Sequence, residues 1–162
     1  MAATLRLPSG EQLVYACDAS THRVVVTDTL GRLRFAFGGY GSRAGQLDTP
    51  LDLAFVAPEF HGERLPSGMT SALWLAVADY GNRRVQIFEL DGCFVAGVEA
   101  HGEHASLGGP CTLTWRAPVL AVEHADGRRS SIHLAAALLS STARAFVGRR
   151  LSATTRLHEV RH

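Results

Sequence analysis

The polar residues with the most specific spacing lie at the end of an apolar run in the middle of the chain. Asp79 closes the run Leu-Trp-Leu-Ala-Val-Ala, Asn82 follows three positions later, and Arg84 precedes the next apolar run. A carboxylate and an amide at this spacing could bind a cation, but these side chains also satisfy backbone N–H groups in tight turns. We expect the second role, with Arg84 bracing the same turn.

Histidines offer a second candidate chemistry. His101 and His104 flank a glycine and Glu103, and together with His124 they could hold a metal ion. Zinc sites need three or four ligands at defined spacings, and a pair of histidines in a glycine-bearing loop does not supply them. The eight histidines are otherwise scattered along the chain. We therefore predict no metal site and no resident cofactor.

The glycines at positions 38, 39, 41 and 45 resemble a phosphate-binding loop only in composition. No strand-to-helix context follows them, and the chain has no Gly-Lys-Ser/Thr motif. The chain also lacks H-E-x-x-H, G-x-S-x-G and paired-carboxylate patterns. Nothing assembles a nucleophile, a base and oxyanion donors, so the sequence predicts no catalytic residue and favours a protein that is not an enzyme.

Short strands position the central polar residues. Residues 73–79 and 85–89 each show the alternation of apolar side chains that is typical of a half-buried strand. Asp91-Gly92 is a strong signal for a hairpin, and Phe94 opens a further strand. This stretch is therefore expected to form three antiparallel strands of one sheet.

The central stretch recurs in the first part of the chain. An offset of 61 residues places Asp18 on Asp79 and Arg23 on Arg84. Because internal repeats determine the whole architecture, this recurrence predicts a fold built from similar supersecondary units. Asp18 and Arg23 are expected to play the same turn-bracing roles as their counterparts.

A third copy follows the central one with more divergence. An offset of 45 residues places residues 128–129 on residues 83–84 and puts His124 where Asp79 stands. Residues 111–115 supply its first strand. After Leu134 the pattern stops, and the alanine- and leucine-rich residues 136–162 are expected to form a helix or an irregular segment.

The central copy resembles an NHL repeat. The family pattern runs apolar strand, Val-Ala-Asp, a variable turn, Asn-x-Arg-Ile/Val, apolar strand, Asp-Gly, and residues 77–92 match it throughout. The first copy departs from the pattern with Thr21 at the asparagine position and Leu30 at the second aspartate position. Residues 37–50 resemble the segment between two blades of this family, and residues 58–64 read as an insertion in the second blade.

The resemblance implies an all-β fold, a propeller-like arc of about three four-stranded antiparallel blades. The blades would occupy residues 1–37, 50–98 and 110–135, forming one domain over residues 1–135. The following ten residues are expected to be buried between the blades: Val14, Val24, Val26, Leu53, Leu75, Val77, Val85, Ile87, Leu113 and Val122. Closed propellers need about four to eight blades, so this is an incomplete NHL-type propeller.

Composition limits the class of partner. All 16 basic residues are arginine, 15 residues are acidic, and the net charge is +1, which argues against wholesale binding to nucleic acid or an anionic membrane. The three cysteines have no metal-type spacing, and the sequence shows no secretory signal and no membrane span. We expect a cytoplasmic protein with reduced thiols.

The resemblance implies a non-catalytic scaffold that binds protein. An arc of three blades leaves sheet faces uncovered at each end, so a protein partner or self-association is expected to complete the propeller. Two alternatives remain open. One is RNA binding, as in tripartite-motif NHL proteins; the other is a fragment of a metal-dependent lyase or lactonase, whose histidines and acids surround the axis of a closed ring.

The repeat offsets also predict where a partner binds. They place His22, Arg83 and Arg128 at the same turn of three successive blades, with Tyr80 nearby. Arginine and tyrosine are favoured interface residues, so we expect His22, Arg83 and Arg128 to face solvent and, with Tyr80, to bind the partner. The residues expected to brace the turns are Asp18, Arg23, Asp79, Asn82 and Arg84.

Overall fold

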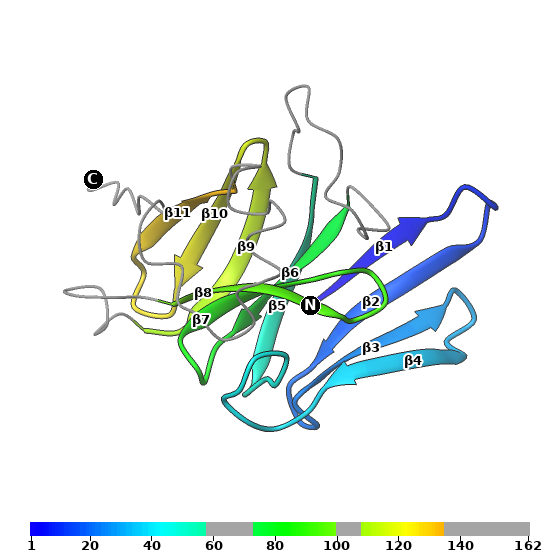
Figure 1. Cartoon of the computed structure of the whole chain (residues 1–162), viewed down its shortest axis with the longest axis horizontal. Helices are drawn as coiled ribbons and strands as arrows, with labels where there is room; N and C mark the ends of the chain where they lie inside the picture. Colours follow the sequence, from blue (N-terminus) through cyan, green and yellow to red (C-terminus); the bar gives the residue numbers. More distant parts are fainter. Residues whose placement is uncertain (58–72, 100–107, 135–162) are drawn as a thin grey trace.

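The computed structural model describes residues 1–57, 73–99 and 108–134. These residues form eleven β-strands and no helix, and the strands make three antiparallel sheets (Figure 1). The expected all-β, incomplete propeller-like fold is thereby confirmed for this part of the chain. The expected C-terminal helix, the insertion at residues 58–64 and the histidine pair at residues 101–104 lie outside the described residues.

Each of the first two sheets contains four consecutive strands in sequence order. The first sheet consists of β1 (Ala2–Arg6), β2 (Gln12–Asp18), β3 (Arg23–Asp28) and β4 (Leu33–Gly38). The second sheet consists of β5 (Pro50–Val56), β6 (Trp74–Asp79), β7 (Arg84–Phe88) and β8 (Phe94–Glu99). In both sheets, an aspartate at the end of the second strand pairs with an arginine at the start of the third, Asp18 with Arg23 and Asp79 with Arg84.

The third sheet has three strands among the described residues. They are β9 (Pro110–Arg116), β10 (Val119–His124) and β11 (Arg129–His133), in the order β11-β10-β9. No described residue belongs to a helix that is long and apolar enough to cross a bilayer.

The hairpin predicted from Asp91-Gly92 is present between β7 and β8. The N–H of Glu89 donates to the carbonyl oxygen of Cys93 at 2.8 Å, and Gly92 has a φ of +91° that a side chain would disfavour. A Cβ atom on Gly92 would also lie only 2.6 Å from the ring of Phe37 in the first sheet. This glycine therefore serves both the turn and the packing between two sheets.

The second sheet is buried on both faces. Every residue of β6 and β7 is buried, and consecutive residues of β6 belong to opposite cores. Leu75 and Val77 pack toward the first sheet, whereas Ala76 and Ala78 pack toward the third. Successive side chains of a strand point to opposite faces, so this alternation places the second sheet in the middle of a three-sheet stack.

The first and third sheets are covered on one face by the second sheet. Of the ten residues expected in the cores, nine are buried, from Val24 in β3 to Val122 in β10. The prediction was wrong for Val14, which is half-buried. Val14 lies on the same side of β2 as the exposed Gln12, whereas its neighbours Leu13 and Tyr15 enter the core.

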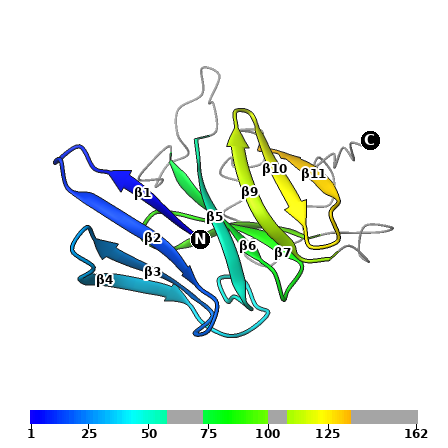
Figure 2. The ribbon, with the colours of Figure 1, turned by 180° about the vertical axis from the view of Figure 1, so that it is seen from behind.

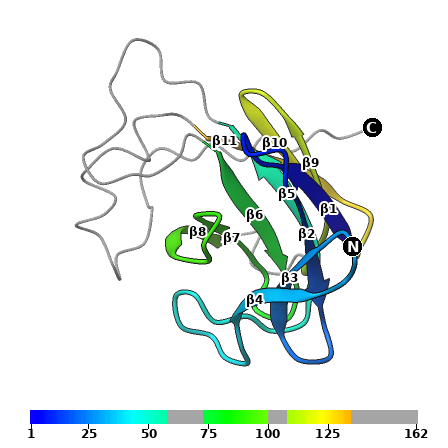
Figure 3. The same ribbon diagram turned by 90° about the vertical axis from the view of Figure 1, so that its right-hand side faces the viewer.

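The first strands of the three sheets converge. Strand β5 contacts both β1 and β9 (Figures 1 and 3). The N–H of Leu113 in β9 donates to the buried carboxylate of Asp52 in β5 at 2.8 Å. Tyr15 joins the first two sheets further out, since its hydroxyl donates to the carbonyl oxygen of Leu90 at 2.9 Å.

The turns between the second and third strands of each sheet lie along one edge of the molecule. These turns span residues 19–22, 80–83 and 125–128, and they follow the lower edge in Figures 1 and 2. We call this surface the turn edge. Residues 39–49, which connect the first sheet to the second and are called the first linker, run along the same edge.

Candidate functional site

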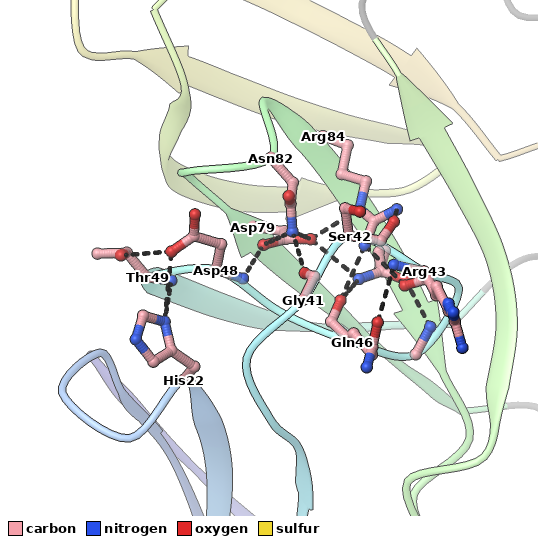
Figure 4. A network of polar contacts seen from close by, with 12 residues as sticks. His22, Gly41, Ser42, Arg43, Gln46, Asp48, Thr49, Asp79, Asn82 and Arg84 are labelled. Carbon is pink, nitrogen blue, oxygen red and sulfur yellow. Dashed lines mark hydrogen bonds and ion pairs between the residues drawn. The ribbon is translucent and has the colours of Figure 1, made fainter.

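A buried aspartate binds the first linker to the second sheet (Figure 4). Asp79 ends β6 and is fully buried. Its Oδ1 accepts the N–H of Asp48 at 2.6 Å, and its Oδ2 accepts Nε of Arg84 at 2.7 Å and Nε2 of Gln86 at 3.0 Å. The amide of Asn82 contacts both carboxylate oxygens, at 3.0 and 2.9 Å. The two carboxylate oxygens are thus occupied by protein donors.

Arg84 extends the same network across the linker. Its guanidinium donates to three backbone carbonyl oxygens as well as to Asp79. These carbonyls belong to Ser42, Arg43 and Gln46, at distances of 2.9, 2.9 and 2.8 Å. Because the guanidinium is a rigid planar fork, these contacts fix both the position and the direction of the linker.

Gln86 completes the network from the adjacent strand β7. Its Nε2 donates to the carbonyl oxygen of Gln46 at 2.6 Å, and its Oε1 accepts the N–H of Gly45 at 3.0 Å. We call Asp79, Asn82, Arg84 and Gln86 the Asp79 network. A carboxylate that is buried and bound on both oxygens has no site left for a substrate or a metal ion, so this geometry favours a structural role.

The third sheet places a histidine at the corresponding position. His124 Nδ1 lies 3.0 Å from the carbonyl oxygen of Gly108, and Nε2 lies 2.7 Å from the hydroxyl of Ser130. A carbonyl can only accept, so Nδ1 carries the proton, and in the neutral ring Nε2 accepts from Ser130. His124 therefore joins the segment before β9 to its own sheet, as Asp79 does in the second sheet.

The turn of the third sheet is one residue shorter than the offset of 45 implies. The N–H of His124 donates to the carbonyl oxygen of Arg128 at 2.9 Å, so Arg128 stands opposite His124 as Arg84 stands opposite Asp79. Arg128 therefore corresponds to Arg84. The predicted alignment of Arg128 with Arg83 was wrong by one position. Arg128 is exposed, and its Nε lies 3.7 Å from Asp126.

The first sheet satisfies its aspartate locally. Oδ1 of Asp18 accepts both the N–H and the hydroxyl of Ser20, at 3.0 and 2.6 Å, and Oδ2 accepts the hydroxyl of Thr21 at 2.7 Å. These hydrogen bonds, with that of Ser20 first, lower the pKa of Asp18 from 3.8 to about 2. Arg23 is exposed, and its side chain forms no hydrogen bond or ion pair with any described residue, so the expectation that it braces this turn was wrong for the described part of the chain.

The residues predicted to bind a partner have different surroundings. His22 is half-buried and faces the first linker, where its Nδ1 accepts the N–H of Thr49 at 3.0 Å and lies 3.3 Å from Oδ1 of Asp48. It does not face solvent freely, in contrast to the expectation. Arg83 is exposed on the turn edge, whereas Tyr80 is half-buried, with its backbone against Gly109.

Sequence reasoning did not identify the first linker as part of a candidate site. Tyr40 is 72% exposed, and its ring lies edge-on to His22 with 4.8 Å between the ring centroids. Arg43 is exposed as well, although its carbonyl oxygen is bound by Arg84. A signal was available in Gln86, because a polar side chain in an otherwise apolar strand requires polar partners from another segment.

The described residues contain no nucleophile with evident activation and no metal cluster. No three histidine, cysteine, aspartate or glutamate side chains in the described ranges gather as a metal site requires. Burial, partly offset by the terminal amine, raises the pKa of the Cys17 thiol to about 12, so this group stays protonated.

Three packed antiparallel sheets with converging first strands define a propeller-like module built from repeats. No family model matches the chain. RING finger protein nhl-1 of Caenorhabditis elegans is 55% identical to this chain over 42 residues, which are 26% of this chain and 4% of that protein. The chain therefore covers a small part of this relative, and the similarity supports an NHL-type repeat within the matching stretch.

Proposed function

We propose that the chain is a non-catalytic interaction module that binds a protein partner through the turn edge. The distribution of charge on this edge carries the proposal. Asp48 and Asp79 direct their carboxylates toward donors within the fold, and Asp18 binds its own turn. The arginines at positions 23, 43 and 83 are exposed on the same edge. This surface therefore presents positive charge, while these three carboxylates are engaged within the fold and that of Asp126 accepts the N–H groups of Gly108 and Arg128.

The rigidity of the edge supports the same proposal. The Asp79 network holds the first linker through several charge-assisted hydrogen bonds, which are shorter and stronger than neutral ones. Loops fixed on a rigid sheet scaffold are common carriers of binding residues. A surface that is ordered before binding loses less conformational entropy when a partner docks.

RNA binding is the alternative that this positive charge also allows. Proteins that bind single strands without sequence preference combine a basic groove with several aromatic platforms. Among the described residues, Tyr40 is the one exposed aromatic side chain. This arrangement favours a protein partner. Self-association through the outer faces of the first and third sheets stays a prediction from the sequence.

A peptide selection tests the proposal. Peptides selected from a random displayed library against the purified chain are measured by fluorescence anisotropy with the wild type and with Arg83→Ala/Arg128→Ala. We expect the double variant to bind about tenfold more weakly, since arginines that anchor interfaces contribute more than about 1 kcal/mol. The matched control is Arg6→Ala/Arg32→Ala, which removes two exposed arginines from the opposite ends of the strands.

Salt dependence separates the two classes of partner. A protein partner gives a shallow decrease in affinity between about 50 and about 200 mM salt, whereas RNA gives a steep one because counterions are released from its phosphates. Tight, steeply salt-dependent binding of oligouridylate, with no peptide selected, would overturn the proposal. Equal affinities of the double variant and the wild type would show that Arg83 and Arg128 do not form the binding surface.

A further inference from the structure

The first linker presents an aromatic side chain on a fixed backbone. The N–H of Leu47 donates to the carbonyl oxygen of Gly39 at 2.9 Å, and the N–H of Gly41 donates to the carbonyl oxygen of Leu47 at 3.1 Å. These bonds hold the backbone on both sides of Tyr40, and Leu47 itself is fully buried in the core. The position of Tyr40 is therefore anchored to the hydrophobic interior.

The side chain of Tyr40 is oriented but not covered. Its ring rests edge-on against His22, with 62° between the ring planes. His22 is in turn held by the N–H of Thr49 at 3.0 Å. The hydroxyl of Tyr40 makes no hydrogen bond with the described residues. An exposed aromatic ring with one braced side is available for contact with a partner.

Arg43 combines a fixed backbone with an exposed side chain in the same way. Its N–H donates to Oε1 of Gln46 at 3.1 Å, and its carbonyl oxygen accepts from Arg84 at 2.9 Å. Its guanidinium forms no ion pair with any described residue. An exposed arginine whose guanidinium has no ion pair among the described residues thus lies three positions from the exposed ring, on the same linker.

We infer that Tyr40 and Arg43 of the first linker form the anchor for an acidic segment of a protein partner. The inference rests on the proposed protein-binding function and adds the chemical class of the partner segment. Arginine binds carboxylates through two parallel hydrogen bonds, and the tyrosine hydroxyl donates to the same acceptors. Tyrosine and arginine are also the residue types that most often dominate binding energy. His22 packs against the ring of Tyr40 and does not itself contact the partner.

The test uses a fluorescein-labelled polyglutamate peptide and the full chain. We expect Tyr40→Ala and Arg43→Ala each to weaken binding about tenfold, as loss of an interface anchor does. Tyr40→Phe keeps the ring and removes the hydroxyl, so it should weaken binding less. The matched controls are Leu33→Ala and Arg32→Ala, which remove an exposed apolar side chain and an exposed arginine from the opposite ends of the strands.

The outcomes separate this inference from the proposed function. Absent polyglutamate binding, or wild-type affinity in both Tyr40→Ala and Arg43→Ala, overturns the acidic anchor. If the selected peptides still depend on Arg83 and Arg128, the proposed function stands without it. Tighter binding of oligouridylate than of polyglutamate, lost in Tyr40→Ala, would identify the anchor as a stacking platform for nucleic acid. Midpoints of urea denaturation that equal the wild-type value establish that each variant keeps the native fold.

Discussion

Asp18 and Asp79 end the second strands of neighbouring sheets, and each is paired across the sheet with an arginine. Their carboxylates nevertheless bind different donors. Asp79 is buried and binds the linker, Arg84 and Gln86, whereas Asp18 binds Ser20 and Thr21 of its own turn. The same pair of residue types at the same place in a repeat thus produces one buried network between segments and one local cap.

The difference follows from the neighbour that each turn meets. The first linker packs against the turn of the second sheet and offers three carbonyl oxygens to Arg84. Arg23 remains exposed, and no described segment offers it an acceptor. Val25 stands in the first sheet where Gln86 stands in the second. Strand β3 therefore also lacks, at this position, a polar side chain that could bind a linker. A repeat position therefore acquires its role from the segment packed against it.

The largest expected difference between the two turns is in stability. Asp79→Ala leaves the buried guanidinium of Arg84 without its carboxylate, and we expect the free energy of unfolding to fall by about 3–5 kcal/mol. Asp18→Ala is the matched control and should cost clearly less, because Arg23 is exposed and needs no counter-charge. Urea denaturation measures both. Equal losses in the two variants would contradict the distinction between a buried network and a local cap.

Exchanging the strand residues sharpens the comparison. Gln86→Val removes the bonds to Asp79, Gln46 and Gly45 and leaves the half-buried N–H of Gly45 without its acceptor, so we expect a loss of about 1–3 kcal/mol. The reverse change, Val25→Gln, should alter stability by less than about 0.5 kcal/mol, since Val25 is half-buried and no described linker faces it. A stabilisation by Val25→Gln comparable to the loss from Gln86→Val would indicate a segment already packed on the first sheet.

The smallest effect concerns the acid titration of the first turn. Hydrogen bonds from Ser20 and Thr21 lower the pKa of Asp18 from 3.8 to about 2. The folded state thus favours the carboxylate, and this contribution to stability is present above pH 3.8 and is lost as the pH falls toward 2. Nuclear magnetic resonance of the Asp18 carboxyl carbon measures the shift directly. In Ser20→Ala/Thr21→Ala the pKa of Asp18 should return toward 3.8. An unchanged pKa would show that these hydrogen bonds do not cause the shift.

Local sequence signals predicted the elements that depend on neighbouring residues. The alternation of apolar residues located the strands, and Asp91-Gly92 located a hairpin whose glycine has the required positive φ. The recurrence of an aspartate and an arginine after 61 residues identified two sheets with the same pairing. These features rest on strand periodicity and turn conformation, which a few consecutive residues specify.

The sequence alone did not predict contacts between distant segments. His22 was expected to face solvent, but it binds Thr49, 27 positions away. Arg128 was aligned with Arg83, but a turn shorter by one residue places it opposite His124. Val14 was assigned to the core because the repeats predicted packed blades, although its side of β2 faces away from the second sheet. Each of these outcomes depends on a neighbour or a register that periodicity does not specify.

The sequence by itself determined that this protein is an all-β repeat in which an aspartate at the end of one strand pairs with an arginine of the next in two of the sheets. Only the tertiary structure decided which of these turns is a buried junction. Arg84 and Ser42 are 42 positions apart, and the packing of the first sheet against the second brings them within hydrogen-bond distance. The physical reason is that turn geometry follows from adjacent residues, whereas burial and charge pairing depend on which surfaces meet when the sheets stack.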